Sequence, residues 1–226
     1  MSPGEMLEML DRLTADELRG QLHCAVIGQQ IIVLEQTSST NDAILEVTWP
    51  QGAAVSSPPS RSNEGLVVFA EHQTAGRGQR GNRWESAAGK GLWFSILLRP
   101  KIEINDSARL TIWAIETVSD AIRTELSLEP SIKLPNDIQL QGRKVAGVLV
   151  EMRAQENAPH LAIVGIGINV NQSMEDFPPE LQSRAISLAM ALQRPVDRQK
   201  FAVAVLRNLD RTYRENFVTE VTTLQG

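Results

Sequence analysis

The polar residues best placed to do chemistry lie in residues 133–151, KLPNDIQLQGRKVAGVLVE. A short strand leads into Asn136 and Asp137, and after a tight turn the chain returns through Lys144 into an apolar strand. Such a hairpin places two polar clusters side by side on rigid backbone. Only five of the chain's 22 basic residues are lysines, and two of the five lie here. A lysine in a strand interior is a candidate for holding an anionic group; the simpler interpretation is a surface ion pair at a strand edge.

A second polar cluster lies in the glycine-rich segment 73–91, which has almost no aliphatic core residue. Four basic residues against Glu85 give this segment a local charge of +3 in an acidic chain: Arg77, Arg80, Arg83 and Lys90. Glycines let backbone N–H groups approach an anion closely, and Trp84 offers a flat surface to a heterocycle. We therefore predict a functional loop, although a solvated basic loop with Trp84 in the core has the same pattern.

The same segment matches GxGxxG at Gly76–Gly81, a pattern found in dinucleotide-binding proteins. That interpretation requires a helix that starts in the loop and an acidic residue about 20 positions further on. The sequence offers neither. No Gly-Lys-Ser/Thr ending follows the glycines, so the segment is not a P-loop.

A third polar run, Ser39-Thr40-Asn41, lies between a predicted strand at 31–34 and a predicted helix that ends near residue 48. These residue types are preferred helix caps. Their hydroxyl and amide groups can also hydrogen-bond a polar ligand. Both interpretations can hold together, because Asn41 can cap the helix while Ser39 binds.

The order of elements predicts an α+β domain with a mixed β-sheet and flanking helices. Helices are expected at 5–22, 40–48, 106–126, 185–192 and 197–217, with a capping box at Thr14. Strands are expected at 31–34, 66–71, 92–98, 132–134, 145–152 and 161–170. The segment 49–65, rich in Pro, Ser and Gly, predicts a loop, and Pro178-Pro179 predicts a break.

The composition is that of a soluble globular protein, with 42% hydrophobic and 22% charged residues. A net charge of −5 argues against nucleic-acid binding by bulk attraction. No apolar run is long enough to span a membrane, and the N-terminus does not resemble a signal peptide. The single cysteine and three scattered histidines give no disulfide and no metal-ligand pattern. A cytoplasmic location is therefore expected.

Three segments together resemble biotin–protein ligases: Ser39-Thr40-Asn41, EHQTAGRGQRGNRWES at 71–86, and the 133–151 hairpin. GIGINVN at 165–171 follows in the order of that family. The resemblance implies the catalytic-domain fold shared by biotin and lipoate ligases, as one domain over 1–226 with an N-terminal helical segment at 1–30. It implies that biotin and ATP form biotinyl-5′-AMP, which then acylates a lysine of a biotin carboxyl carrier domain.

The resemblance also implies roles for individual residues. The catalytic candidates are Lys144, Asp137 and Arg77. The biotin-binding candidates are Ser39, Thr40, Asn41, Gln73, Gly76, Arg77, Gly78, Gln79, Lys144 and Gly147. The nucleotide-binding candidates are Arg80, Trp84, Asn136, Lys144 and Asn169. Mg²⁺ is expected to accompany ATP, and no metal ligand is assigned to the protein.

The chain departs from the family pattern in ways that carry expectations. Gln79 stands where many members have Arg, so the charge that retains the adenylate should rest on Arg77, Arg80 and Lys144. Leu134 replaces a common Trp, apolar for apolar. About 30 residues precede the first strand, fewer than a winged-helix domain needs, so no DNA binding is expected. The small SH3-like C-terminal domain is expected to be absent, and a homodimer is compatible with the family.

Other functions fit parts of the pattern. A lipoate or octanoate ligase would share the fold, although the hairpin and the GRGQRG run match the biotin branch. A non-catalytic biotin- or adenylate-binding protein would share the site, and an unrelated nucleotide-binding domain requires the three-segment match to be accidental. Because an acyl adenylate is destroyed by water, residues 77–90 are expected to be poorly ordered without ligand and to become ordered over it.

Overall fold

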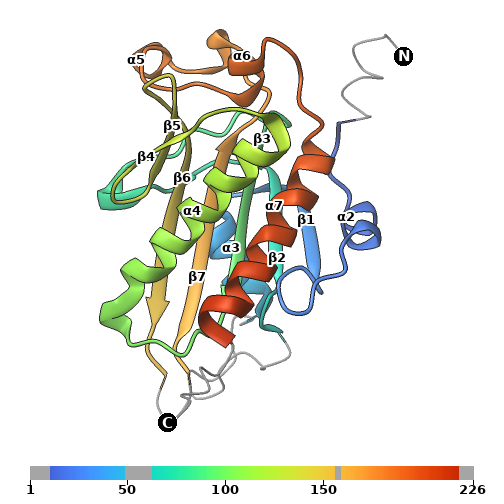
Figure 1. Cartoon of the computed structure of the whole chain (residues 1–226), viewed down its shortest axis with the longest axis vertical. Coiled ribbons are helices and arrows are strands. Elements are labelled where there is room, and N and C mark those ends of the chain that lie inside the picture. The colour runs from blue at the N-terminus through green and yellow to red at the C-terminus, as the bar shows by residue number, and fades with distance from the viewer. Residues whose placement is uncertain (1–10, 49–62, 156–158, 219–226) are drawn as a thin grey trace, which may run out of the picture.

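The structure, a computed structural model, describes residues 11–48, 63–155 and 159–218 (Figure 1). Its seven strands form one sheet in the order β1-β2-β3-β7-β6-β5-β4. The strands are β1 (Ile31–Thr37), β2 (Val67–Gln73), β3 (Gly91–Leu98), β4 (Ser131–Lys133), β5 (Asp137–Leu140), β6 (Arg143–Arg153) and β7 (Leu161–Asn169). β1 and β2 are parallel and all other neighbours are antiparallel. The mixed sheet confirms the predicted α+β class.

Helices cover both faces of this sheet. The α-helices of the described residues are α2 (Ala15–Gln21), α3 (Thr40–Thr48), α4 (Ser107–Leu126), α5 (Pro179–Gln182), α6 (Leu188–Leu192) and α7 (Arg198–Tyr213). Short 3-10 turns lie at Gln79–Gly81, Ile104–Asp106 and Met174–Asp176, and a π-helical turn at Arg214–Val218. α4 and α7 lie side by side across one face, and α3 lies against the other (Figure 1).

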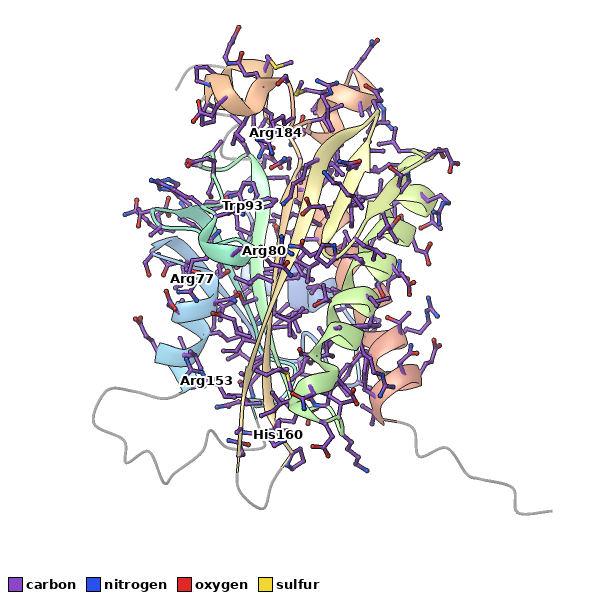
Figure 2. The ribbon with its side chains drawn as sticks, turned by 90° about the vertical axis from the view of Figure 1, so that its left-hand side faces the viewer. Arg77, Arg80, Trp93, Arg153, His160 and Arg184 are labelled. Atoms are coloured by element: carbon purple, nitrogen blue, oxygen red, sulfur yellow. The ribbon has the colours of Figure 1, made fainter. Side chains whose placement is uncertain are left out.

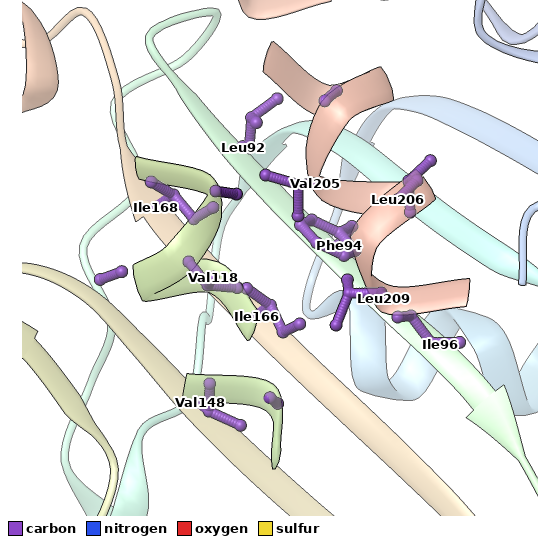
Figure 3. Packing of buried hydrophobic residues seen from close by; sticks show 14 of the residues in the cluster. Leu92, Phe94, Ile96, Val118, Val148, Ile166, Ile168, Val205, Leu206 and Leu209 are labelled. Atoms are coloured by element: carbon purple, nitrogen blue, oxygen red, sulfur yellow. The ribbon is translucent and has the colours of Figure 1, made fainter. Parts of the chain in front are cut away.

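Strand alternation explains this layering, because successive side chains point to opposite faces. β3 is buried along its whole length. Its even-numbered residues pack under α4 and α7, where Leu92, Phe94 and Ile96 lie near Val205, Leu206 and Leu209 (Figure 3). Leu97 points the other way and joins a smaller cluster with Ile44 of α3. The face beneath α3 thus carries less apolar packing and leaves room for a polar site.

Several local predictions can be compared with the structure. Thr14 caps α2 as predicted, accepting a hydrogen bond from the Glu17 backbone N–H at 3.4 Å. Gln141 and Gly142 both have positive φ, which confirms the tight hairpin turn. The helix predicted at 185–192 begins only at Leu188, because Ser187 caps it. Predictions for residues 5–10 and for most of the 49–65 loop lie outside the described residues.

The region after β7 differs from the prediction of a simple break. Pro179 starts the one-turn helix α5, a position where a missing N–H costs nothing. Further on, Ala185 pairs with Lys144 as an isolated bridge. The Lys144 N–H donates to the Arg184 carbonyl at 2.7 Å, and the Ile186 N–H donates to the Lys144 carbonyl at 2.9 Å. The hairpin strand that carries Lys144 is therefore fixed on both sides.

Candidate functional site

The polar run at the start of α3 is held from below by the sheet. Thr40 and Asn41 are buried, and the Thr40 N–H donates to Gln73 Oε1 at 2.8 Å. Ser95, fully buried in β3, lies 2.8 Å from Thr40 Oγ1 and 2.5 Å from Asn41 Oδ1. α3 begins at Thr40, which leaves Ser39 in the capping position that we expected for Thr40 or Asn41. Its hydroxyl lines the cleft, without a hydrogen-bond partner in the described part of the chain.

The floor of the cleft is bare backbone. Gly147 of β6 pairs with Gly167 of β7, and Gly165 lies two residues earlier on β7. A Cβ at Gly165 would lie 2.3 Å from Asn41 Oδ1, and one at Gly167 would lie 2.6 Å from the Trp84 ring. Side chains at these positions would therefore displace the groups that line the cleft. Of the three, only Gly147 was among the predicted site residues.

Trp84 and Lys144 meet over this floor. The Trp84 ring lies against Gly147 and Gly167, and the Lys144 ammonium lies 5.1 Å from the ring centroid. Lys144 Nζ is also 2.6 Å from Asp137 Oδ1, across the hairpin. The ring and the carboxylate therefore contact the Lys144 amine from two sides. Trp84 is therefore a cleft residue, half-buried, as opposed to part of the main core.

Arg77 closes one side of the cleft. Its guanidinium donates to both Asp42 oxygens at 2.6 Å, and to Glu151 Oε2 at 3.0 Å. The hydrogen bonds to Asp42 raise the pKa of Arg77 above its usual value, with Glu151 adding to the effect. Glu151 Oε2 also accepts from Asn41 Nδ2 at 2.6 Å, which joins this ion pair to the start of α3. An anion that binds Arg77 must share it with two carboxylates.

The glycine-rich loop (residues 74–90) lies beside α3, on the face opposite α4 and α7 (Figure 2). The Gly78 N–H donates to the Asn82 carbonyl at 2.7 Å, and the Trp84 N–H donates to the Gly76 carbonyl at 2.9 Å. With the Arg77 ion pairs, these bonds give the loop a defined path made by protein contacts. The ordering of residues 77–90 over a ligand stays a prediction.

The cleft encloses about 420 Å³, including its solvent-open side. It is lined by ten of the residues predicted from the sequence: Ser39, Thr40, Asn41, Gln73, Arg77, Gly78, Trp84, Asn136, Lys144 and Gly147. Residues from segments more than a hundred positions apart in the chain thus meet at one place. Asn136 adds a structural bond, since its Nδ2 donates to the Val148 carbonyl at 2.9 Å.

Some predicted residues lie elsewhere. Gln79 and Arg80 form the turn at the loop tip, with Arg80 exposed, and neither lines the cleft. Gly76 is buried behind Trp84, and Asp137 reaches the cleft through Lys144. Asn169, predicted to contact a nucleotide, is buried and engaged inside the protein. Its Nδ2 donates to the carbonyls of Lys144 and Ile186, and its Oδ1 accepts from Gln172. Packing therefore makes Asn169 a support for the Lys144 backbone.

The structure also adds residues that sequence reasoning missed. Val148, Leu149, Gly165, Ile166 and Gly167 line the cleft, Ser95 holds α3, and Asp42 and Glu151 pair with Arg77. The alternation of Gly165 and Gly167 along a predicted strand was a usable signal, because glycines in strands mark close approach of other groups. The acidic partners of Arg77 had no such signal.

With this geometry in place, comparison with known proteins decides the family. A model of the "Biotin/lipoate A/B protein ligase family" matches residues 33–169, which include the start of α3, the glycine-rich loop and the hairpin. The chain belongs to this family. Both the predicted resemblance and the predicted family fold are confirmed.

Individual relatives agree with this placement. The "Bifunctional ligase/repressor BirA" of Bacillus spizizenii is 37% identical over 90% of this chain, and the chain spans 60% of that protein. The "Biotin--[acetyl-CoA-carboxylase] ligase" of Mycobacterium tuberculosis is 32% identical over 85% of this chain and 68% of its own length. The solved biotin protein ligase of Aquifex aeolicus, in complex with biotin and ATP, is 31% identical, with a TM-score of 0.65 over 84% of this chain and 72% of that chain.

Two further observations concern the described residues only. None of their helices is long and apolar enough to cross a membrane. They also contain no group of three or more His, Cys, Asp or Glu side chains that could hold a metal ion.

Proposed function

We propose that this chain is an ATP-dependent biotin–protein ligase. It joins biotin to AMP as biotinyl-5′-AMP and transfers the biotinyl group to a lysine of a biotin carboxyl carrier domain. The observation that carries the proposal is the Lys144 ammonium, 5.1 Å from the Trp84 ring and 2.6 Å from Asp137, beside a glycine floor. Family membership and the names of the relatives support the choice of biotin.

The first half-reaction brings two anions together. A biotin carboxylate oxygen attacks the α-phosphorus of ATP, the bond to pyrophosphate breaks, and pyrophosphate leaves. Negative charge repels negative charge along this path, so a fixed cation that does not reorganise lowers the barrier. Lys144 is such a cation, because its backbone is bonded to the 184–186 segment and its amine rests against Trp84.

The second half-reaction requires an unprotonated amine. The carrier lysine attacks the acyl carbon, the bond to AMP breaks, and the amine loses a proton. Asp137 lies beside Lys144, so its carboxylate can accept this proton once the phosphoryl charge has left. Biotin itself is expected to bind between the start of α3 and the glycine floor, where hydroxyl and amide groups line the cleft.

Mg²⁺ belongs to the proposal with ATP. The donors fit a Mg²⁺ bound mainly through phosphates and waters, since Asp137 offers one carboxylate at the cleft. When bound, Mg²⁺ neutralises phosphate charge. The proposal also includes a catalytic domain formed by the described residues, a cytoplasmic location and a homodimer as the assembly to test.

The decisive experiment is biotin-dependent exchange of pyrophosphate into ATP, run beside lipoate, followed by transfer to a carrier domain. Exchange with biotin and labelling of the carrier lysine are expected. Exchange with lipoate but not with biotin would show that the chain is a lipoate ligase and contradict the biotin proposal. Binding of biotin without exchange would make the chain a non-catalytic binding protein.

A further inference from the structure

Both ends of the glycine-rich loop are joined by one buried side chain. Arg198, in the first turn of α7, has 1% of its surface exposed. Its Nη1 donates to Glu71 Oε2 at 2.8 Å and to the Gly91 carbonyl at 3.0 Å. Glu71 lies in β2 just before the loop leaves that strand, and Gly91 is the first residue of β3, where the loop returns. Arg198 thus reaches both stems from the opposite face of the sheet.

Backbone hydrogen bonds complete this junction. The Gly89 N–H donates to the Glu71 carbonyl at 3.0 Å, and the Asn171 N–H donates to the Lys90 carbonyl at 2.6 Å. The second carboxylate oxygen of Glu71 accepts from the Leu13 N–H at 2.8 Å. The rest of the guanidinium is held by Asp11, with Arg198 Nε 3.2 Å from Asp11 Oδ2 and Nη2 donating to the Asp11 carbonyl. A shift of the stems would break the buried Arg198–Glu71 ion pair and the bond to the Gly91 carbonyl.

Packing connects this junction to the reacting groups. Gly91 lies so close to Trp93 that a Cβ would be 2.1 Å from the Trp93 ring. The Trp93 ring meets the Trp84 ring edge-on, at 5.9 Å between centroids. Trp84 in turn lies under the Lys144 ammonium. Because close-packed groups transmit displacement, a shift of the Gly91 stem moves the surface on which Lys144 rests.

Fold stability alone gives little reason to bury an arginine here, since a buried ion pair is often replaceable by apolar residues without loss. We propose that Arg198 is a positioning residue, which fixes the separation of the two loop stems and so holds Trp84 against Lys144. This inference deepens the proposed function and rests on it for its catalytic consequence. Arg198 itself touches neither biotin nor ATP in this scheme.

The test uses the full chain with Arg198→Met and Glu71→Gln combined. The double variant removes both buried charges, and the Asp11 carboxylate that loses its partner is 33% exposed and stays hydrated. The double variant is therefore expected to fold with a thermal midpoint near that of the wild type. Met cannot donate to the Gly91 carbonyl, so the stems lose their common anchor. We expect the KM for biotin and the release rate of biotinyl-5′-AMP to rise on the order of tenfold, with a smaller change in kcat.

Hydrogen exchange supplies a readout that does not depend on activity. Amides of residues 74–90 should exchange faster in the ligand-free double variant, while those of β3 and β7 stay protected. Arg198→Lys keeps the positive charge and a hydrogen-bond donor toward the stems. Its loop amides should therefore keep most of the wild-type protection against exchange. If the wild type fails the pyrophosphate exchange but the loop amides respond as stated, the positioning role stands and the proposed function falls.

Arg207→Met is the matched control. Arg207 also lies on α7 and donates to the Gln21 carbonyl at 2.6 Å, but it does not touch either stem. It should leave exchange at 74–90 and the KM for biotin unchanged. A folded double variant with wild-type exchange in the loop, wild-type KM and wild-type adenylate release would overturn the inference.

Discussion

Lys144 combines a fixed backbone with a paired amine. Its N–H and carbonyl are bonded to the 184–186 segment, and Asn169 donates to the same carbonyl. The amine faces Asp137 and Trp84, with about a third of the side chain exposed. A lysine with these neighbours is a pre-placed positive charge that a ligand can reach. Because this charge is already in place, no free energy is needed to order it when the reaction begins.

Lys144→Ala is therefore expected to reduce biotin-dependent pyrophosphate exchange by a factor of at least ~100, the loss typical of one preorganised charge. The fold should persist, because the backbone bonds of residue 144 do not depend on its side chain. Far-UV circular dichroism checks the fold beside the activity assay. Lys133→Ala, which removes the exposed lysine of the same hairpin, is the control and should retain activity. Wild-type exchange in Lys144→Ala would remove Lys144 from the mechanism.

At the scale of elements, the two faces of β6 and β7 have different roles: one packs in the core and the other lines the cleft. Ala146, Val148 and Ile166 pack under α4 and α7. On the other face, Gly147 and Gly165 leave the backbone open to the cleft. The period of two along each strand makes this division possible without any change of secondary structure. Alternating residues of the same two strands thus form the floor of the site and one side of the core.

Gly165→Ala tests the floor. The added Cβ would lie 2.3 Å from Asn41 Oδ1, which Ser95 also holds, so Asn41 must move. The KM for biotin is expected to rise about tenfold or more, as small misplacements of positioning groups do. Gly20→Ala in α2 is the matched control, since no atom lies within 4 Å of its Cβ. It should leave KM unchanged and stabilise the helix by up to about 1 kcal/mol. An unchanged KM in Gly165→Ala would show that Asn41 does not position biotin.

Ligand binding should tighten the glycine-rich loop further. Arg77 is shared by Asp42 and Glu151, both more than a third exposed, so its ion pairs are screened by water and can reopen. We expect amide exchange at residues 77–90 to slow when biotin and ATP are added, because an acyl adenylate needs protection from water. Exchange in α4 should not change. Equal exchange in the loop with and without ligand would rule out a role as a lid.

At the scale of the whole molecule, α7 contacts both the segment before β1 and the stems of the glycine-rich loop. Asp210, buried on α7, accepts hydrogen bonds from the backbone N–H groups of Ala25, Val26 and Ile27 at 3.2, 2.7 and 2.8 Å. Arg198 ties the same helix to the loop stems. One helix therefore couples the segment before β1 to the sheet and, through the stems, to the site.

Cys24 reports on this packing through its titration. Burial, helped by the Asp210 carboxylate, raises the pKa of the Cys24 thiol from 9.0 to about 11. The fold disfavours the thiolate, so the thiol's contribution to stability is complete below pH 9.0 and is lost as the pH rises toward about 11. The difference in free energy of unfolding between wild type and Cys24→Ala should follow that course. A small disulfide reagent should react slowly at neutral pH and rapidly after unfolding in urea. A difference that is flat over this pH range would contradict the prediction.

The sequence by itself determined the class of fold and the three polar segments of the site. Alternating apolar residues, the Thr14 cap and the Gln141-Gly142 turn are local signals, so they could be read without knowing the fold. The helix starts at Pro179 and Leu188 could not be read from the sequence, because there a capping side chain and the pairing of Ala185 with Lys144 decide where the helices begin. The resemblance to biotin–protein ligases joined the three segments, and the sheet then brought them to one cleft.

Only the tertiary structure decided which side chains face that cleft. Strand register set Gly165 and Gly167 beneath Asn41 and Trp84, and packing turned Asn169 away from the cleft to hold the Lys144 backbone. The partners of Arg77 and the junction at Arg198 join residues far apart in the chain. Such contacts depend on how elements pack, which no local pattern encodes.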